Sequence, residues 1–423
     1  MRILWVKADK LLPVQNGGNI RTYHVLRYLS ARHELTFYSY YGGAPDPHYE
    51  RDLQQQFPGA VAVSTGKREL AGAARGLDYL AHLSAEPPYA VSRFAHAPVQ
   101  KQLQTWFRAR RFDVAVCDFL DAAVNFPGSL SIPSVLFQHN VESEIWRRHA
   151  ATAGNPAKKM MYRMEFRKML RYERAAVCKF QHVIAVSAND RSLMTRWVDG
   201  DRVTVVPTGV DLAEYQPDPS LSDTSAPLIT FVGAMDWEPN VDGVEYFCTE
   251  VWPSIKAEVP EARFRIVGRN PDRRVQKWAS NSINDGGSIE VTGRVPSIVE
   301  HLRQSAVVIV PLRIGGGTRL KIYEAMATGK AVVSSTVGAE GLDVHHGRDI
   351  ILADDPRSFA QAVIMILRDP ELRHRYEKAA VETAARYDWP AIGERFSEVL
   401  QSAAEKKSLA VRTIPARLAE NKA

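Results

Sequence analysis

The chain has 423 residues, which is too long for one ordinary domain and suits two domains of roughly 200 residues each. Apolar residues make up 45% of the sequence and charged residues 24%, a globular composition that excludes disorder, collagen and coiled coil as descriptions of the whole chain. Lys and Arg number 54 against 48 Asp and Glu, a net charge of +6. So mild an excess fits an anionic ligand or a membrane-facing patch better than a dedicated nucleic-acid binder.

The cysteines and the first residues indicate a cytoplasmic protein. Cys117, Cys178 and Cys248 lie far apart and lack the spacing of a metal or redox motif. An odd, sparse set of cysteines is typical of a reducing compartment. Charges interrupt the N-terminus too early for a signal peptide, and no apolar run is long enough to span a membrane.

Short apolar runs alternate with longer amphipathic segments along the whole chain. In the first half we expect strands at 2–6, 35–39, 61–64, 114–117, 134–137, 183–186 and 203–207, with helices such as 20–30 and 98–110 between them. In the second half we expect strands at 228–232, 263–267, 288–291, 307–310, 331–334 and 349–352, with helices at 241–259, 297–304, 318–327 and 356–368. Val and Ile runs without polar alternation indicate parallel strands covered on both faces. The pattern predicts an α/β protein with two doubly wound, Rossmann-like domains.

The composition also predicts the domain boundaries. The first domain covers 1–207, and a linker covers 208–227, because its second part is rich in Pro, Ser and Asp. The second domain covers 228–388. The remaining 389–423 begins with a helix that has Ile392, Phe396 and Leu400 on one face, and we expect it to fray from Lys406 onward.

The loop after the strand at 307–310 is the strongest candidate for a binding site, because ligands of parallel sheets bind beyond the carboxyl ends of the strands. Gly315, Gly316 and Gly317 are followed by Thr318, which we expect to be the N-cap of the next helix. Successive glycines let backbone N–H groups close around an anion, and the helix N-terminus adds partial positive charge. The alternative is an ordinary glycine-rich turn.

Arg319 and Lys321 fall in the first turn of this expected helix. Cations there oppose the helix dipole by roughly a few tenths of a kcal/mol, a penalty that a bound polyanion would remove. Glu324, further along the helix, is placed to accept hydrogen bonds from paired hydroxyls such as those of a ribose. Two weaker candidates are Gly233, after the strand at 228–232, and the Gly17-Gly18 pair between the first strand and the first helix, both of which a tight turn also explains.

With these residues in view, the chain resembles a retaining glycosyltransferase of family 4 with the GT-B architecture, in a branch with a Gly-Gly-Gly-Thr-Arg-Leu-Lys loop. The resemblance covers nearly the whole sequence. The segments that carry it are the Gly17-Gly18 loop, 138–140, 184–187, 205–211, 232–233, 267–268 and Tyr-Glu-Ala-Met-Ala-Thr-Gly at 323–329.

The resemblance implies roles for several residues and also shows where this sequence differs from the family pattern. Glu324 matches a family glutamate that contacts the nucleotide ribose, whereas the position of a second family glutamate is Gly316. The family also has an Arg and a Lys that bind the diphosphate, and those positions are Ala234 and Pro239 here. Arg319 and Lys321 would replace the two cations.

What the resemblance implies is a metal-independent hexosyltransferase-type enzyme with two domains that face each other across a cleft and a C-terminal helix that crosses back. The donor would be a nucleoside-diphosphate sugar on the C-terminal domain, with no other cofactor. The acceptor would be a glycan or a lipid-linked molecule on the N-terminal domain. His139 matches a family histidine near the donor sugar, although a structural hydrogen bond also explains it. Asp118, at the end of a strand, would face the acceptor or cap a turn.

Three further patterns bear on the function. Asp199-Gly-Asp201 matches a metal-binding motif but precedes a strand, so we interpret it as a turn and propose no metal. The basic stretch 158–179 fits peripheral contact with an anionic membrane or, alternatively, a solvated helix face. The missing glutamate at Gly316 leaves two other functions open: a catalytically silent subunit that binds nucleotide sugars, and a sugar-nucleotide epimerase of the same architecture.

Overall fold

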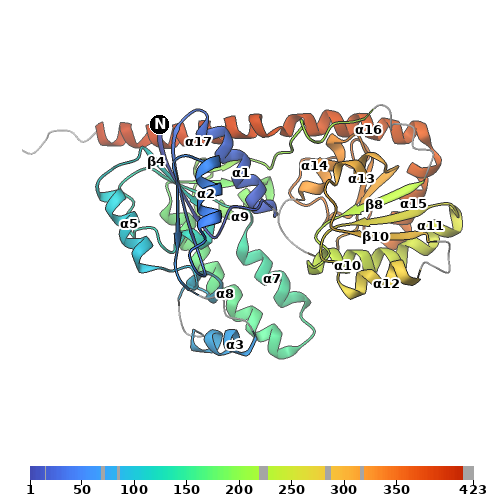
Figure 1. The fold of residues 1–423 in the computed structure, drawn as a ribbon, viewed down its shortest axis with the longest axis horizontal. Helices are drawn as coiled ribbons and strands as arrows, with labels where there is room; N and C mark the ends of the chain where they lie inside the picture. Colours follow the sequence, from blue (N-terminus) through green and yellow to red (C-terminus); the bar gives the residue numbers. More distant parts are fainter. Residues whose placement is uncertain are drawn as a thin grey trace, which may run out of the picture. The chain divides into compact units, whose positions relative to one another are not determined.

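The computed structural model describes residues 1–14, 16–67, 72–82, 86–218, 227–281, 287–314 and 319–412. The chain divides into two compact units, shown in Figure 1. The first unit consists of Met1–Val206 together with the chain from Gly393 onward, and the second consists of Pro207–Ile392. Each unit is built on its own parallel sheet, so the predicted pair of doubly wound α/β domains is confirmed.

The sheet of the first unit has seven parallel strands in the order β3-β2-β1-β4-β5-β6-β7. Their bounds are β1 (Arg2–Ala8), β2 (Glu34–Tyr41), β3 (Ala60–Ser64), β4 (Val114–Asp118), β5 (Ser134–Phe137), β6 (His182–Ala185) and β7 (Val203–Val205). In the register, Ile3 of β1 pairs with Leu35 on one side and with Val114 on the other. The strand order reverses between β1 and β4, which makes the carboxyl ends of these two strands the expected place for a ligand.

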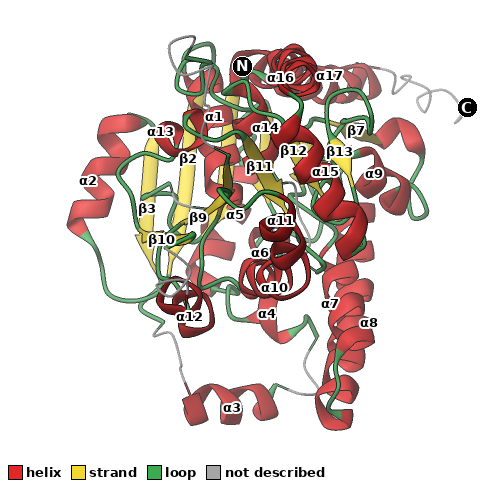
Figure 2. Ribbon diagram, turned by 90° about the vertical axis from the view of Figure 1, so that its right-hand side faces the viewer, coloured by secondary structure: helices red, strands yellow, loops and turns green. Residues whose placement is uncertain are grey.

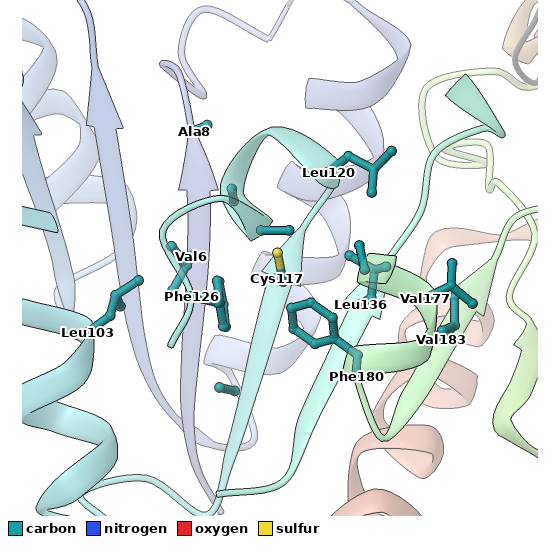
Figure 3. Packing of buried hydrophobic residues seen from close by; sticks show 14 of the residues in the cluster. Val6, Ala8, Leu103, Cys117, Leu120, Phe126, Leu136, Val177, Phe180 and Val183 are labelled. Carbon is teal, nitrogen blue, oxygen red and sulfur yellow. The ribbon is translucent and has the colours of Figure 1, made fainter. Parts of the chain in front are cut away.

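Helices cover both faces of this sheet. They are α1 (Gly17–Ser30), α2 (Pro47–Gln56), α3 (Gly72–Ala81), α4 (Tyr89–Ser92), α5 (Ala97–Arg108), α6 (Leu120–Ala123), α7 (Glu142–Thr152), α8 (Pro156–Lys179), α9 (Ala188–Met194) and the 3₁₀ turn η1 (Gly200–Arg202). Figures 1 and 2 show α7 and α8 side by side as a helical hairpin. On one face of the sheet, strand side chains pack against α5 and α8, as Figure 3 shows for Val6, Cys117, Leu136, Val183, Leu103, Val177 and Phe180.

The sheet of the second unit has six parallel strands in the order β10-β9-β8-β11-β12-β13. Their bounds are β8 (Leu228–Val232), β9 (Arg263–Val267), β10 (Ile289–Gly293), β11 (Val307–Val310), β12 (Val332–Ser334) and β13 (Ile351–Leu352). The helical elements are α10 (Glu238–Tyr246), the π-helical turn η3 (Phe247–Val251), α11 (Trp252–Glu258), α12 (Arg273–Asn281), α13 (Val299–Arg303), α14 (Leu320–Ala327), α15 (Pro356–Arg368), α16 (Pro370–Ala384) and η5 (Ala385–Tyr387). Here the strand order reverses between β8 and β11.

Several expected helices differ from the structure, and three of the differences have a local cause. The helix expected at 241–259 is α10, η3 and α11 in succession, because Pro253 has no N–H for the regular hydrogen bond and the Trp252 N–H instead reaches the Phe247 carbonyl. The helix expected at 20–30 begins at Gly17, because Asn16 caps it. The final helix α17 (Trp389–Arg412) continues past Lys406, where fraying was expected, since strong helix formers follow and the next proline is Pro415.

Helix α17 joins the first unit through aromatic contacts. The Phe396 ring stacks on Trp5 of β1 with 5.3 Å between ring centroids, and it meets the edge of Phe137 of β5 at 5.0 Å. Gly393 lies so close to Tyr28 of α1 that an added Cβ atom would come within 2.2 Å of the tyrosine ring. Glycine is therefore required where the helix approaches α1.

Candidate functional site

The helix that follows β11 begins later than the sequence predicts. Its first residue is Leu320, and Arg319 is the N-cap residue in place of the expected Thr318. Arg319 makes no capping hydrogen bond, because a guanidinium has only donors and a cap must supply an acceptor. The N-terminus of α14 therefore has two cations beside it and no side-chain acceptor from its cap. Gly315, Gly316, Gly317 and Thr318 lie outside the described residues.

Lys321 and Asn240 connect α14 and α10, the helices that follow β11 and β8. The Lys321 Nζ donates to Asn240 Oδ1 at 2.9 Å and lies 4.4 Å from the centroid of the Phe231 ring. The Asn240 Nδ2 in turn donates to the Ala234 carbonyl at 2.8 Å, which fixes the orientation of the amide. Burial, and next the charge of Arg319, lower the pKa of Lys321 to about 7, although Glu324 partly opposes them. A bound anion would stabilise the protonated form of this lysine.

Gly233 makes room for these two side chains at the end of β8. An added Cβ atom would lie 2.6 Å from Asn240 Nδ2 and 2.8 Å from Lys321 Nζ. Gly233 was a weak candidate from the sequence, yet the structure places it against Lys321, a residue of the strongest candidate site. Asn240 was missed as a site residue, because only the fold brings it to Lys321.

Glu324 is the third charged residue of this region, which we call the Lys321 cluster: Gly233, Asn240, Arg319, Lys321 and Glu324. Its carboxylate accepts a hydrogen bond from the Tyr215 hydroxyl. Burial raises the pKa of Glu324 to about 7, while Lys321 and Tyr215 work in the opposite direction. Tyr215 belongs to the segment expected as a linker, which explains why the sequence analysis missed it. A carboxylate has further lone pairs, so Glu324 can accept hydrogen bonds from a ligand as well.

The first unit carries a second group, the His139 cluster, defined by Arg21, Thr22, Asp118 and His139. Asp118 ends β4 and His139 follows the neighbouring β5, so the two meet at the carboxyl edge of the sheet, where His139 Nε2 lies 2.6 Å from Asp118 Oδ1. The other carboxylate oxygen accepts hydrogen bonds from Thr22 Oγ1 at 2.8 Å and Trp5 Nε1 at 3.1 Å. Asp118 therefore binds neighbouring side chains inside the unit and caps no turn.

The protonation state of this cluster follows from its contacts. Burial alone would raise the pKa of Asp118, but Lys7, whose Nζ lies at 3.5 Å, and His139 together hold it well below its usual range. Burial lowers the pKa of His139 to about 4, so the ring is neutral at pH 7. Arg21 Nη1 lies 2.9 Å from His139 Nδ1. Because arginine can only donate, Nδ1 accepts, and the ring proton is on Nε2, where it donates to Asp118.

Both ring nitrogens of His139 are thus engaged, and its predicted catalytic role stays a prediction. Gly18 lies beside it, with an added Cβ atom 3.9 Å from His139 Nδ1. Gly17 and Gly18 form the first turn of α1, in which Arg21 follows one turn later. Arg21 is 3% exposed and was missed, although its helical spacing from Gly18 places it on the same side of α1.

The comparisons with known proteins agree with this arrangement. A family model described as Glycosyltransferase Family 4 matches residues 15–214, and one described as Glycosyl transferases group 1 matches residues 226–369. The two models match the two units in turn. The chain therefore belongs to the family 4 glycosyltransferases.

Relatives in this family share part of the sequence. A phosphatidyl-myo-inositol mannosyltransferase of Mycolicibacterium smegmatis is 29% identical over 226 residues, which are 52% of this chain and 56% of the relative. A D-inositol 3-phosphate glycosyltransferase of Thermobispora bispora is 27% identical over 235 residues, 51% of this chain and 53% of the relative. The chain thus spans about half the length of the curated relatives it matches.

Solved structures show the same GT-B fold. The sucrose-phosphate synthase of Thermosynechococcus elongatus has a TM-score of 0.70 at 16% identity, covering 97% of this chain and 100% of the other. HepE of Anabaena in complex with UDP has a TM-score of 0.66 at 15% identity, covering 95% and 100%.

Where the resemblance leads us to expect an Arg and a Lys, the chain has Ala234 and Pro239. Pro239 lies in the first turn of α10 and is followed by Asn240. The Asn240 side chain accepts a hydrogen bond from Lys321, which lies beside Gly233. Among the described residues, no group of three or more His, Cys, Asp or Glu side chains is placed to hold a metal ion. None of the helices in the described part of the chain is both long enough and apolar enough to cross a membrane.

Proposed function

We propose that the chain is a metal-independent, retaining glycosyltransferase that transfers a sugar from a nucleoside-diphosphate sugar to a glycan or lipid-linked acceptor. The Lys321 cluster carries the proposal: two cations and an uncapped helix N-terminus suit a diphosphate, and a carboxylate beyond them suits a ribose. The names of the two relatives state glycosyl transfer, and HepE has been solved with UDP and with UDP-glucose. The second unit would hold the donor and the first unit the acceptor.

In the proposed reaction the bond between the anomeric carbon and the diphosphate oxygen breaks, and the acceptor oxygen bonds to that carbon. The diphosphate oxygen takes the proton of the acceptor hydroxyl, so no protein nucleophile is needed. Negative charge grows on the leaving oxygen, where Lys321, Arg319 and the α14 N–H groups would stabilise it. Removing one such group typically costs about 2.7–4 kcal/mol of transition-state stabilisation.

A thermal-shift panel of nucleoside diphosphates and their sugars tests the function. A ligand that binds only the folded chain raises its melting temperature. We expect at least one nucleoside diphosphate to stabilise the protein, and we expect its 2′-deoxy counterpart to stabilise it less. In the Glu324→Gln variant this ribose preference should shrink, because an amide presents one acceptor where the carboxylate presents two. No stabilisation by any member of the panel would contradict the proposal.

The reaction products distinguish a transferase from the two alternatives, a silent subunit and an epimerase. A transferase releases free nucleoside diphosphate in proportion to the sugar transferred, whereas an epimerase converts one nucleotide sugar into another. A silent subunit binds the donor and releases nothing. Sugar transfer would be supported if nucleoside diphosphate is released and the donor that remains is still the original nucleotide sugar.

We also propose that the exposed face of α8 contacts anionic lipid headgroups. Met160 is 66% exposed near the start of α8, where the cations Lys158 and Arg163 are exposed as well. Apolar and basic side chains together suit a membrane interface. Co-sedimentation with phosphatidylcholine vesicles should increase when phosphatidylglycerol is added, and the increase should fall several-fold in Lys158→Gln/Arg163→Gln. The charge-matched Arg375→Gln/Lys378→Gln pair on α16 should behave as wild type, and equal effects of the two pairs would contradict the assignment.

A further inference from the structure

The first unit contains a pocket that none of the assignments above uses. It lies at the carboxyl ends of β1, β2 and β3, where Asp9, Tyr40 and Thr65 line it, on the other side of β1 from the His139 cluster. Its volume of about 450 Å³ falls within the range of small-molecule sites, about 300–1,000 Å³. The position matches the rule that ligands bind beyond the carboxyl edge of a parallel sheet.

Rigid aromatic rings form much of the lining. The Tyr40 hydroxyl donates to the Asp121 carbonyl at 3.3 Å, and the Tyr41 hydroxyl donates to Glu50 Oε1 at 2.8 Å, so both buried rings are held in place. Tyr89 and Phe94 add two partly exposed rings. The Tyr89 hydroxyl donates to Asp78 Oδ2 at 2.7 Å, which fixes that ring as well. The electron-rich face of an aromatic ring attracts the polarised C–H groups of a sugar ring.

The charged residues of the pocket balance each other. Asp9 and Asp78 provide two carboxylates, and Lys67 and Arg93 provide two cations. Both cations already bind backbone carbonyls: Lys67 Nζ donates to Ala95 at 2.6 Å, and Arg93 Nε donates to Ala90 at 3.2 Å. The carboxylates have partners as well: Asp9 Oδ1 accepts from the Lys10 N–H at 2.7 Å, and Asp78 Oδ2 accepts from the Tyr89 hydroxyl. Each carboxylate has further lone pairs that can accept hydrogen bonds from ligand hydroxyls, and the two charges of each sign cancel. This balance favours a neutral, hydroxyl-rich ligand over a phosphate.

The backbone at Asp9 supports a ligand site. Asp9 has φ of 81°, in the left-handed region that few residues other than glycine adopt. Backbone of this kind is enriched at binding sites, and here it lies directly after β1 at the rim of the pocket.

We propose that this pocket binds the acceptor through a neutral, hydroxyl-rich ring such as a pyranose. The assignment rests on the proposed glycosyltransferase function and extends it, because it names the class of acceptor and the residues that recognise it. Tyr89 and Phe94 would pack against the ring, and Asp9 and Asp78 would accept hydrogen bonds from its hydroxyls.

Saturation-transfer NMR with small neutral ligands tests the proposal directly. The probes are methyl α-glucopyranoside, methyl α-mannopyranoside, maltose and myo-inositol, and glucose 6-phosphate is the charged comparison. We expect a saturation-transfer signal for at least one neutral probe. This signal should fall several-fold in Tyr89→Ala and in Phe94→Ala. Tyr89→Phe, which keeps the ring, should retain most of the signal.

The outcomes separate this proposal from the proposed function. Nucleoside-diphosphate stabilisation should be unchanged in Tyr89→Ala and Phe94→Ala, since the Lys321 cluster lies in the second unit. A far-UV circular dichroism spectrum equal to that of the wild type shows that the first unit of each variant folds. Failure of nucleotides to bind the wild-type chain would refute the transferase and leave the pocket assignment to the NMR result. Three results would overturn the pocket assignment: no saturation-transfer signal for any neutral probe, stronger binding of glucose 6-phosphate, or a signal that neither alanine variant changes.

Discussion

Replacing Lys321 by Ala is expected to reduce the rate of sugar transfer, or of donor hydrolysis, by about 100- to 1,000-fold, the usual effect of removing one group that stabilises a developing oxyanion. The affinity for nucleoside diphosphate should fall as well, because Lys321 is a cation beside the N-terminus of α14. Nucleoside-diphosphate release and titration calorimetry measure the two effects.

Arg313 supplies the matched control for Lys321. It also follows β11, but its Nη2 already binds Asp242 at 2.6 Å. Arg313→Ala should therefore leave both the rate and the affinity nearly unchanged. If the two substitutions caused equal losses, or if Lys321→Ala had no effect, Lys321 would not be the diphosphate ligand.

The affinity should also depend on pH in a specific direction. Because burial lowers the pKa of Lys321 to about 7, the free protein loses this charge as the pH rises above 7. Binding of a diphosphate then requires uptake of a proton, so the affinity should fall by up to about tenfold per pH unit above 7. Lys321→Arg keeps its charge and should flatten this dependence.

Replacing Asp118 by Asn is expected to lower the free energy of unfolding by about 3–5 kcal/mol, the usual result of removing one partner from a buried ion pair. The carboxylate is 1% exposed, and both of its oxygens are in use. An amide would leave Lys7 without its buried counter-charge and would face one of the donors around it with an N–H group. Urea unfolding at pH 7 measures the change.

Two comparisons make the Asp118 prediction specific. Asp113→Asn removes a carboxylate just before the same strand, but its partner Arg2 is half exposed, so the loss should stay below about 1 kcal/mol. The contacts of Asp118 hold its pKa below the ordinary 3.8, so its contribution is present above pH 3.8 and is lost as the pH falls further. The difference in the free energy of unfolding between wild type and Asp118→Asn should thus become smaller below pH 3.8. A constant gap would argue against a charge effect.

The sequence predicts the sheets well, because buried parallel strands are continuous runs of Val and Ile. β5, β8, β9 and β11 begin and end where expected, and so does helix α15. Two of the helix differences depend on single residues: Asn16 starts α1 early, and Pro253 forces a π turn into a helix that periodicity makes continuous.

The candidate sites were only partly predictable. His139 lies just after β5, and Lys321 lies in the first turn of the helix that follows β11, so their place near the carboxyl edges of the two sheets follows from the order of the elements. Their partners Asn240, Tyr215 and Arg21 come from other segments, and no local pattern marks them. Which nitrogen of His139 carries the proton, for example, depends on Arg21 and Asp118 together.

The packing of α17 has a consequence for how the chain is made. Phe396, from the last helix, covers Trp5 and Phe137, and Gly393 fits against Tyr28. The second unit is one continuous segment, whereas the first unit is interrupted and needs residues from before and after that segment. During synthesis the aromatic rings of the N-terminal segment therefore stay uncovered until the ribosome has made the whole second unit and the start of α17. A fragment that ends at Val206 lacks Phe396, so Trp5 and Phe137 would stay exposed and the fragment would aggregate.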